Sequence, residues 1–185
     1  DHRPSRRRGA QGRAPLAPAA GTVQIIILSG LSGAGKSVAL HMLEDLGYYC
    51  IDNMPAALLK PFIAHTVRSS EKIYARTAIS LDARNSDAEI SSVPMLIDEL
   101  KRSGIDCEVL FLTAEDDELL LRFAETRRAH PLSRQGETLR EAIASERRLL
   151  EPIAHVADQV IDTSRMGVHQ LRDLVGRRVD PRAPE

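Results

Sequence analysis

The chain contains no tryptophan, and only 3% of its 185 residues are aromatic. A sheet face that stacks RNA bases needs aromatic side chains, so this composition does not support one. The only two cysteines, Cys50 and Cys107, are expected to be buried free thiols in a reducing compartment. No apolar run approaches the roughly 20 residues of a membrane helix, and the start lacks the apolar core of a secretory signal. These absences favour a cytoplasmic protein with no membrane contact.

Charge is unevenly distributed, although the formal net charge is only −1. Residues 1–22 hold five arginines against one aspartate, a charge of +4, and the remainder has 20 basic and 25 acidic residues, a charge of −5. We expect residues 1–22 to be a disordered tail; contact with nucleic acid or an acidic surface is the alternative. The acidic remainder gives no electrostatic support for a nucleic-acid-binding domain.

One short motif follows the tail. It matches G-x-x-x-x-G-K-[ST], the phosphate-binding P-loop, and consists of Gly30, Leu31, Ser32, Gly33, Ala34, Gly35, Lys36 and Ser37. The continuous apolar run at residues 23–29 predicts a strand buried on both faces before the motif. Helical spacing of apolar residues over 36–46 predicts a helix after it, which Gly47 ends. The motif therefore has the strand–loop–helix context that its chemistry needs.

The residue types of this motif suit a nucleoside triphosphate. Glycines let the backbone approach the phosphates closely, and the first amides of the helix have no internal partner and can bind an anion. We expect Lys36 to reach the β- and γ-phosphates and the Ser37 hydroxyl to bind Mg²⁺. The motif does not distinguish ATP from GTP.

Strand and helix patterns alternate along the chain after residue 22. Apolar runs predict strands at residues 23–29, 48–51, 74–81, 108–112 and 160–161. Helical spacing predicts helices at residues 36–46, 56–69, 93–102, 116–128, 139–155 and 167–179. Ser92 is expected to cap the third of these helices, and Thr138 and Glu141 form a capping box ahead of the fifth. Repeated β-α units predict an α/β domain over residues 23–179, with helices on both faces of a parallel sheet.

Acidic and basic residues follow the predicted strands at the edge where such sheets bind ligands. Asp82 follows the third strand, as a Walker B aspartate does, and either holds Mg²⁺ or serves as a cap or turn residue. Asp52 follows the second strand and either orients a water molecule or acceptor hydroxyl, or caps the helix after Pro55. Arg84 either meets a phosphate or base edge, or is a solvated arginine.

Many arginines surround the helix break at His130. A helix–break–helix segment rich in arginine resembles the lid of small P-loop kinases, where arginines stabilise the transferring phosphoryl group. We predict a catalytic role for Arg127 and Arg128, because they lie at a helix end beside the break. His130 is expected to be structural, because a lone histidine provides neither a nucleophile nor a metal geometry. The remaining arginines are expected to form a solvated face with Glu125, Glu137, Glu141 and Glu146.

Two GTPase signatures are missing from the places where they would function. No Asn-Lys-x-Asp motif follows any predicted strand. The one D-x-x-G match begins at Asp173, inside the last predicted helix, where it cannot sense a γ-phosphate. A Ras-like GTPase is therefore not predicted.

Several segments occur in a specific order: GLSGAGKSVAL at 30–40, LEDLGYYCIDNMP at 43–55, DARN at 82–85, RFAETRRAHPLS at 122–133, ERRLLEP at 146–152 and DTS at 162–164. This series resembles the amino-terminal half of the RapZ/YvcJ family of nucleotide-binding proteins. The resemblance covers about residues 23–179 and is more specific than the P-loop alone.

The resemblance implies a P-loop NTPase fold of the kinase-like type that binds ATP and GTP and hydrolyses them slowly. It implies an ATP site at residues 30–37 and a GTP segment made of Asp82, Ala83, Arg84 and Asn85. In this family a carboxy-terminal domain carries RNA binding, and some members present small regulatory RNAs to a ribonuclease. We expect residues 180–185 to be a linker toward such a domain, through which an RNA or protein partner would bind.

Three hypotheses follow for the function. The first is an ATP/GTP-binding regulatory domain with weak Mg²⁺-dependent hydrolysis. The second is a small-molecule or nucleotide kinase with an acceptor pocket near Asp52, Arg84 and the helix at 56–69. The third is an RNA-binding module acting alone, which the acidic charge of residues 23–185 opposes. The sequence leaves the oligomeric state open, a homo-oligomer included.

Overall fold

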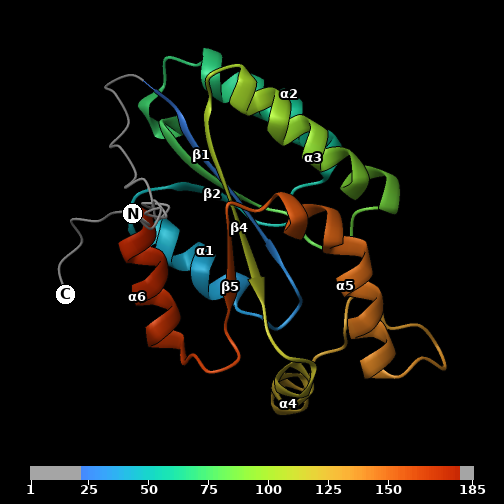
Figure 1. Ribbon diagram of the computed structural model, residues 1–185. Helices are drawn as coiled ribbons and strands as arrows, with labels where there is room; N and C mark the ends of the chain where they lie inside the picture. The colour runs from blue at the N-terminus through green and yellow to red at the C-terminus, as the bar shows by residue number, and fades with distance from the viewer. Residues whose placement is uncertain (1–21, 180–185) are drawn as a thin grey trace, which may run out of the picture.

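A parallel sheet of five strands, in the order β2-β3-β1-β4-β5, forms the centre of the fold (Figure 1). The structure is a computed structural model that describes residues 22–179. Its strands are β1 Gln24–Gly30, β2 Tyr49–Ile51, β3 Arg76–Ser80, β4 Asp106–Thr113 and β5 Gln159–Asp162. The predicted α/β class with a parallel sheet is confirmed, whereas the predicted tail and linker lie outside the described residues, Thr22 excepted.

Strand β1 lies between β3 and β4 and is covered on both sides. Ile25, Ile26, Ile27 and Leu28 have no exposed surface, as a continuous apolar run predicts for a central parallel strand. In register, Ile26 pairs with Ala78 of β3 and with Glu108 of β4. The carboxyl end of β1, where the P-loop begins, is thereby held by neighbours on both sides.

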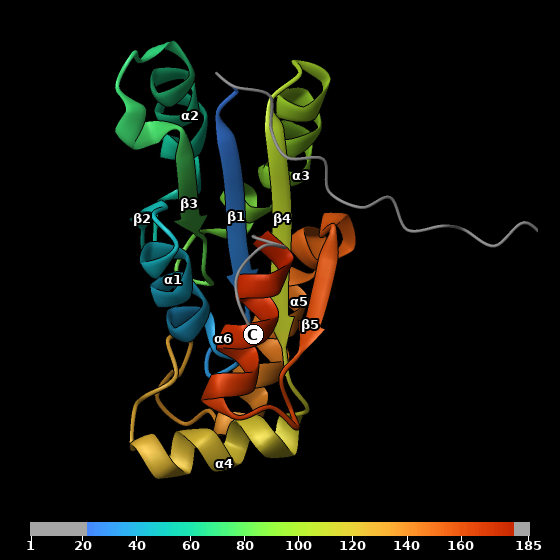
Figure 2. The same ribbon diagram turned by 90° about the vertical axis from the view of Figure 1, so that its left-hand side faces the viewer.

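Helices cover both faces of the sheet, which gives the predicted three layers. Helices α1 and α6 lie on one face and α3 and α5 on the other, while α4 lies across the carboxyl ends of the strands (Figures 1 and 2). The helices are α1 Lys36–Asp45, α2 Leu59–Arg68, α3 Asp87–Arg102, α4 Asp116–Thr126, α5 Leu139–Val156 and α6 Val168–Val179. None of these described helices is long and apolar enough to cross a membrane.

Helix α3 begins earlier than the sequence predicted, so the assignment of Ser92 as its cap is wrong. Its cap is Ser86, whose Oγ accepts a hydrogen bond from the Glu89 amide at 3.3 Å. The Glu89 carboxylate in turn accepts from the Ser86 amide at 2.9 Å, which completes a capping box. Pro94 misled the prediction, since proline favours a first turn but here lies in the helix interior.

Two other helix predictions need smaller corrections. The predicted helix over 56–69 consists of a 3-10 turn, η1 Ala56–Leu58, followed by α2; a second 3-10 turn, η2 Lys72–Tyr74, precedes β3. Helix α4 ends at Thr126 rather than at residue 128. The capping box of Thr138 and Glu141 is confirmed, because both of its hydrogen bonds are present.

The cysteines are free thiols, as predicted. Cys107 is buried, whereas Cys50 is only half-buried. Burial raises the pKa of the Cys107 thiol to about 12 and that of Cys50 to about 11. Both are therefore protonated and poorly nucleophilic at neutral pH.

The α3 cap gives a test of the corrected helix start. Ser86→Ala removes the side-chain oxygen that satisfies the Glu89 amide and should lower the thermal midpoint by about 2–4 °C. Ser92→Ala is the matched control, since Ser92 bonds only to the Glu89 carbonyl inside the helix. Thermal denaturation followed by circular dichroism measures both; a larger loss in Ser92→Ala would restore the original assignment.

Candidate functional site

The P-loop turns sharply where β1 meets α1. At Gly30 φ is +143°, and an added Cβ would lie 2.2 Å from the Leu112 carbonyl oxygen, so only glycine fits against β4. Gly33 and Gly35 also have positive φ, at 85° and 109°. Gly35 is the N-cap of α1 and provides no side-chain cap, and the first turn contains no acidic residue. The first α1 amides are therefore open to an anion.

Lys36 folds back over the loop. Its Nζ donates a hydrogen bond to the Gly30 carbonyl at 2.6 Å. Burial lowers the pKa of Lys36, while the charges of Glu146, Asp82 and Asp52 act to raise it. These three carboxylates therefore lie close enough to act electrostatically on one ammonium group. The structure brings together the predicted Lys36, Asp52 and Asp82.

Asp82 and Arg84 form an ion pair at the end of β3. Asp82 is buried, and its Oδ1 accepts from the Arg84 amide at 3.0 Å. Its Oδ2 accepts from Arg84 Nε at 2.9 Å and lies 2.8 Å from a terminal guanidinium nitrogen. The hydrogen bond and charge of Asp82 raise the pKa of Arg84. Arg84 is thus held by Asp82 while much of its side chain faces solvent.

The segment after β3 is tied to the segment after β2. Asn85 accepts from the Ala56 amide at 2.7 Å and donates to the Asp82 carbonyl at 3.1 Å. Asp52 accepts from the Ser80 hydroxyl at 2.7 Å and does not cap the helix after Pro55, because the Ala56 amide is taken by Asn85. Asp52 is exposed at the rim, which leaves its other predicted role open.

The residues predicted to hold Mg²⁺ provide suitable atoms. Ser37 is exposed in the first turn of α1, and Asp82 lies within electrostatic reach of Lys36 in that same turn. A hydroxyl and a carboxylate are hard oxygen donors, and Mg²⁺ takes its remaining ligands from water and phosphate. Within residues 22–179, no group of three or more His, Cys, Asp or Glu forms an all-protein metal site. The donor set fits a metal that arrives with a nucleotide.

Glu146 of α5 is a residue that the sequence analysis placed on a solvated face, and that placement is wrong. It is 1% exposed, and its carboxylate accepts from the amide and the hydroxyl of Ser32, each at 2.6 Å. A signal for this burial was present in the sequence. Glu146 follows Ile143 by three residues and precedes Leu150 by four, so it lies on the apolar face of the helix.

Arg122 is the arginine that reaches the P-loop. Its guanidinium donates to the Gly33 carbonyl at 3.1 Å and to the hydroxyl and carbonyl of Thr163 at 3.0 and 2.7 Å. Arg127 and Arg128, which we predicted to be catalytic, are exposed after α4 and make no side-chain hydrogen bond to any described residue. Their catalytic role stays a prediction. The spacing of the arginines in the sequence did not identify the contact of Arg122 with the P-loop.

Two further residues hold the lid-like segment in place. Arg147 bonds to Asp116 at 2.7 and 2.9 Å, to the Thr113 hydroxyl at 3.1 Å and to the Ala114 carbonyl. His130 is 3% exposed, and its Nδ1 accepts from the Leu132 amide at 3.0 Å. These contacts agree with a structural role for His130.

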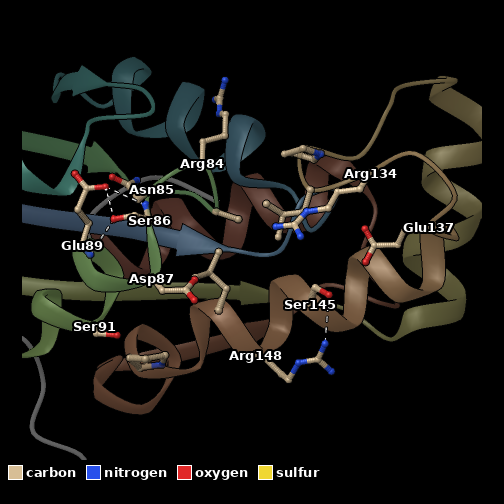
Figure 3. A pocket seen from close by; sticks show the side chains of 15 residues that line it. Arg84, Asn85, Ser86, Asp87, Glu89, Ser91, Arg134, Glu137, Ser145 and Arg148 are labelled. Atoms are coloured by element: carbon tan, nitrogen blue, oxygen red, sulfur yellow. Dashed lines mark hydrogen bonds between the residues drawn. The ribbon is translucent and has the colours of Figure 1, made fainter.

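A cavity of about 910 Å³ opens beside the segment that holds Asp82. Residues from the segments 83–91 and 131–137 and from α5 line it, and Figure 3 shows Arg134 and Glu137 extending toward it. Neither Asp52 nor α2 lines this cavity, so it does not lie where the acceptor pocket was expected, beside the helix at 56–69. Arg84 does line it, as expected.

The Arg122 contacts predict a stabilising role that can be measured. Arg122→Ala removes the donor to the Gly33 carbonyl, leaves the Thr163 carbonyl with the Met166 amide alone, and should lower the free energy of unfolding by about 2 kcal/mol. Urea denaturation measures this loss. The control is Arg102→Ala, which removes an exposed pair with Asp98 and should change it by less than about 0.5 kcal/mol. Equal losses would show that Arg122 does not brace the loop.

Solved structures with the same fold include kinases. Shikimate kinase from Acinetobacter baumannii, in complex with shikimate, is 17% identical with a TM-score of 0.54, over 89% of this chain and 97% of that one. Shikimate kinase from Bacteroides thetaiotaomicron is 18% identical with a TM-score of 0.50, over 83% and 95%. At these identities the likeness shows the kinase-like P-loop fold alone.

Curated relatives are much closer in sequence. A nucleotide-binding protein of Methylococcus capsulatus is 49% identical over 157 residues, which are 85% of this chain and 53% of the relative. One of Pseudomonas aeruginosa is 45% identical over 157 residues, 85% of this chain and 55% of the relative. The chain thus spans about half the length of these relatives. Residues 23–182 match the model of the RapZ-like N-terminal domain, and the chain belongs to that family.

Proposed function

We propose that this chain is an ATP- and GTP-binding regulatory domain with weak, Mg²⁺-dependent hydrolysis. The observation that carries the proposal is the P-loop geometry. The open first turn of α1 and the Lys36 ammonium converge at the carboxyl end of β1, with the Asp82 carboxylate nearby. Backbone amides and Lys36 would hold the phosphates. Ser37 and Asp82 would hold Mg²⁺, which supplies charge neutralisation when bound.

The contacts of Arg122 and Arg84 support slow hydrolysis, and Arg127 and Arg128 remain the predicted catalytic arginines. Arg122 is engaged by the Gly33 carbonyl and Thr163, and Arg84 is engaged by Asp82. An arginine that stabilises a transferring phosphoryl group must be free to meet it. The exposed Asp52 carboxylate would orient the attacking water. Slow turnover suits a domain whose nucleotide state is read by another part of the protein.

The proposed function also involves a second domain. Because the chain spans about half of its relatives, we propose that a carboxy-terminal domain responds to the nucleotide and carries the contact with RNA or protein. The segment of Asp82, Ala83, Arg84 and Asn85 is the proposed GTP contact, as the family resemblance implies. A cytoplasmic location belongs to the same proposal.

A kinase is the second candidate, and the cavity beside Asp82 favours it. Its volume of about 910 Å³ is large enough for a small-molecule acceptor. Arg84 and Arg134 line it and would bind an anionic group of such an acceptor. Phosphoryl transfer to a defined small molecule, faster than release of phosphate to water, would establish this candidate over the first.

Lys36→Ala tests the nucleotide site. Loss of the ammonium should weaken binding of Mg·ATP and Mg·GTP at least about tenfold and abolish phosphate release, because Lys36 is the side chain expected to contact the β- and γ-phosphates. Calorimetry gives affinity, and a phosphate sensor gives turnover. Lys60→Ala, an exposed lysine paired with Glu99, is the control. Unchanged affinity in Lys36→Ala would refute the proposal.

Asp82→Asn tests the metal role separately. The amide keeps the shape of the side chain but loses the charge that attracts Mg²⁺, so the gain in ATP affinity on adding Mg²⁺ should shrink about tenfold. Titrations with Mg²⁺ and with EDTA measure that gain. Asp98→Asn, an exposed position of α3, is the matched control. An undiminished Mg²⁺ effect in Asp82→Asn would remove Asp82 from the metal site.

A further inference from the structure

The P-loop donates hydrogen bonds to a carboxylate of its own chain. Ser32 gives both its amide and its hydroxyl to Glu146, one to each carboxylate oxygen, at 2.6 Å. Glu146 is 114 residues further along the chain, in α5. These are donors of the loop that cradles phosphate, and a carboxylate is the closest side-chain analogue of a phosphate oxygen pair.

Glu146 is charged in this position. Burial opposes its ionisation, but His130, the two Ser32 donors and Lys36 outweigh that effect and lower the pKa of Glu146. His130 Nδ1 accepts from Leu132, so a neutral ring carries its proton on Nε2, which lies 3.5 Å from a Glu146 oxygen. Nε2 has no hydrogen-bond partner of its own among the described residues. The carboxylate is thus a buried anion that accepts from Ser32 on one side and faces the His130 ring on the other.

The charge of Glu146 also acts on Lys36, beside the place where the terminal phosphate of a triphosphate would lie. Of the groups that raise the pKa of Lys36, Glu146 acts most strongly, ahead of Asp82 and Asp52. Lys36 is the residue that reaches the β- and γ-phosphates of a P-loop ligand. A terminal phosphoryl group there meets a fixed negative charge in a poorly solvated place, where like charges repel strongly.

From these contacts we infer that Glu146 is a specificity-determining residue that competes with the terminal phosphoryl group for the Ser32 donors and for Lys36. The inference rests on the proposed nucleotide binding. Two anions cannot hold the same two donors, so a bound triphosphate displaces the Glu146 carboxylate. A diphosphate, which lacks the terminal group, leaves it in place. Glu146 therefore lowers affinity for triphosphates and couples nucleotide state to His130 and the segment that follows it.

A purely structural role for Glu146 predicts the opposite result. A carboxylate that only braces the loop would, when removed, loosen the loop and weaken ATP and ADP alike. Glu146→Gln separates the two roles, because glutamine has nearly the same shape and keeps an oxygen for Ser32, but lacks the charge. The measured quantity is the ratio of ATP to ADP affinity.

We expect Glu146→Gln to bind a Mg²⁺ complex of a non-hydrolysable ATP analogue about tenfold more tightly than wild type, and Mg·ADP within about threefold. Calorimetry measures both. Glu151→Gln makes the same change at an exposed position of α5 and should match wild type. Weaker or unchanged analogue binding by folded Glu146→Gln, or an equal gain for ADP, overturns the inference. Two other results would instead refute the proposed function: the wild-type protein binds no nucleotide, or Lys36→Ala binds nucleotide with the affinity of the wild type.

Hydrogen exchange of the wild-type protein gives an independent test that needs no variant to fold. The ATP analogue should slow amide exchange over residues 31–37 and speed it over 130–133, where His130 loses its neighbour Glu146. Mg·ADP should slow exchange over 31–37 only. Slower exchange over 31–37 with no gain over 130–133 in the presence of the ATP analogue would show that Glu146 stays in place, and the inference would be wrong.

Discussion

The close approach of Gly30 to the Leu112 carbonyl is the constraint on which the rest of the site depends. A Cβ at Gly30 would lie 2.2 Å from that oxygen, and the Leu31 amide donates to the same oxygen at 3.0 Å. The chain therefore leaves β1 pressed against β4 and turns at once. This turn leaves the Gly30 carbonyl to Lys36 and starts α1 with open amides. Backbone geometry thus determines where an anion can bind before any side chain contributes.

Three carboxylates near the P-loop act on the Lys36 ammonium group. Asp52, Asp82 and Glu146 arrive from three different parts of the chain and act on Lys36 against the effect of burial. Each carboxylate has its own donor: the Ser80 hydroxyl for Asp52, Arg84 for Asp82 and Ser32 for Glu146. Glu146 is the most deeply buried of the three, and a buried carboxylate without donors would be protonated or expelled, so its Ser32 donors help to lower its pKa and keep it charged.

The second half of the chain braces the loop from the other side. Arg122 joins the Gly33 carbonyl to Thr163 after β5, and Arg147 joins α5 to the segment after β4. Both arginines make several charge-assisted hydrogen bonds to fixed oxygens, which restrains them more than a single exposed ion pair would. The P-loop therefore depends on residues about 90 to 130 positions further along the chain. A change in its conformation would be felt in the second half of the chain.

Local sequence patterns predicted the sheet and the position of the P-loop. The run Ile25, Ile26, Ile27 and Leu28, the P-loop spacing, and the alternation of strands and helices predicted a parallel α/β sheet and the position of its phosphate loop, because burial and turn chemistry act over a few residues. Helix ends were less predictable. Ser86 and Ser92 are both acceptable caps by sequence, and Pro94 favoured the wrong one.

Only the tertiary structure decided which charged residues belong to the site. Spacing favoured Arg127 and Arg128, at the helix end, over Arg122 within the helix, yet Arg122 alone of the three bonds to the P-loop, through the Gly33 carbonyl. From the sequence, Glu146 was assigned to a charged, solvated face. In the structure α5 packs against the sheet, and Glu146 accepts hydrogen bonds from Ser32. Such roles depend on contacts between residues distant in sequence, and no local periodicity specifies which side chains the folded chain brings together.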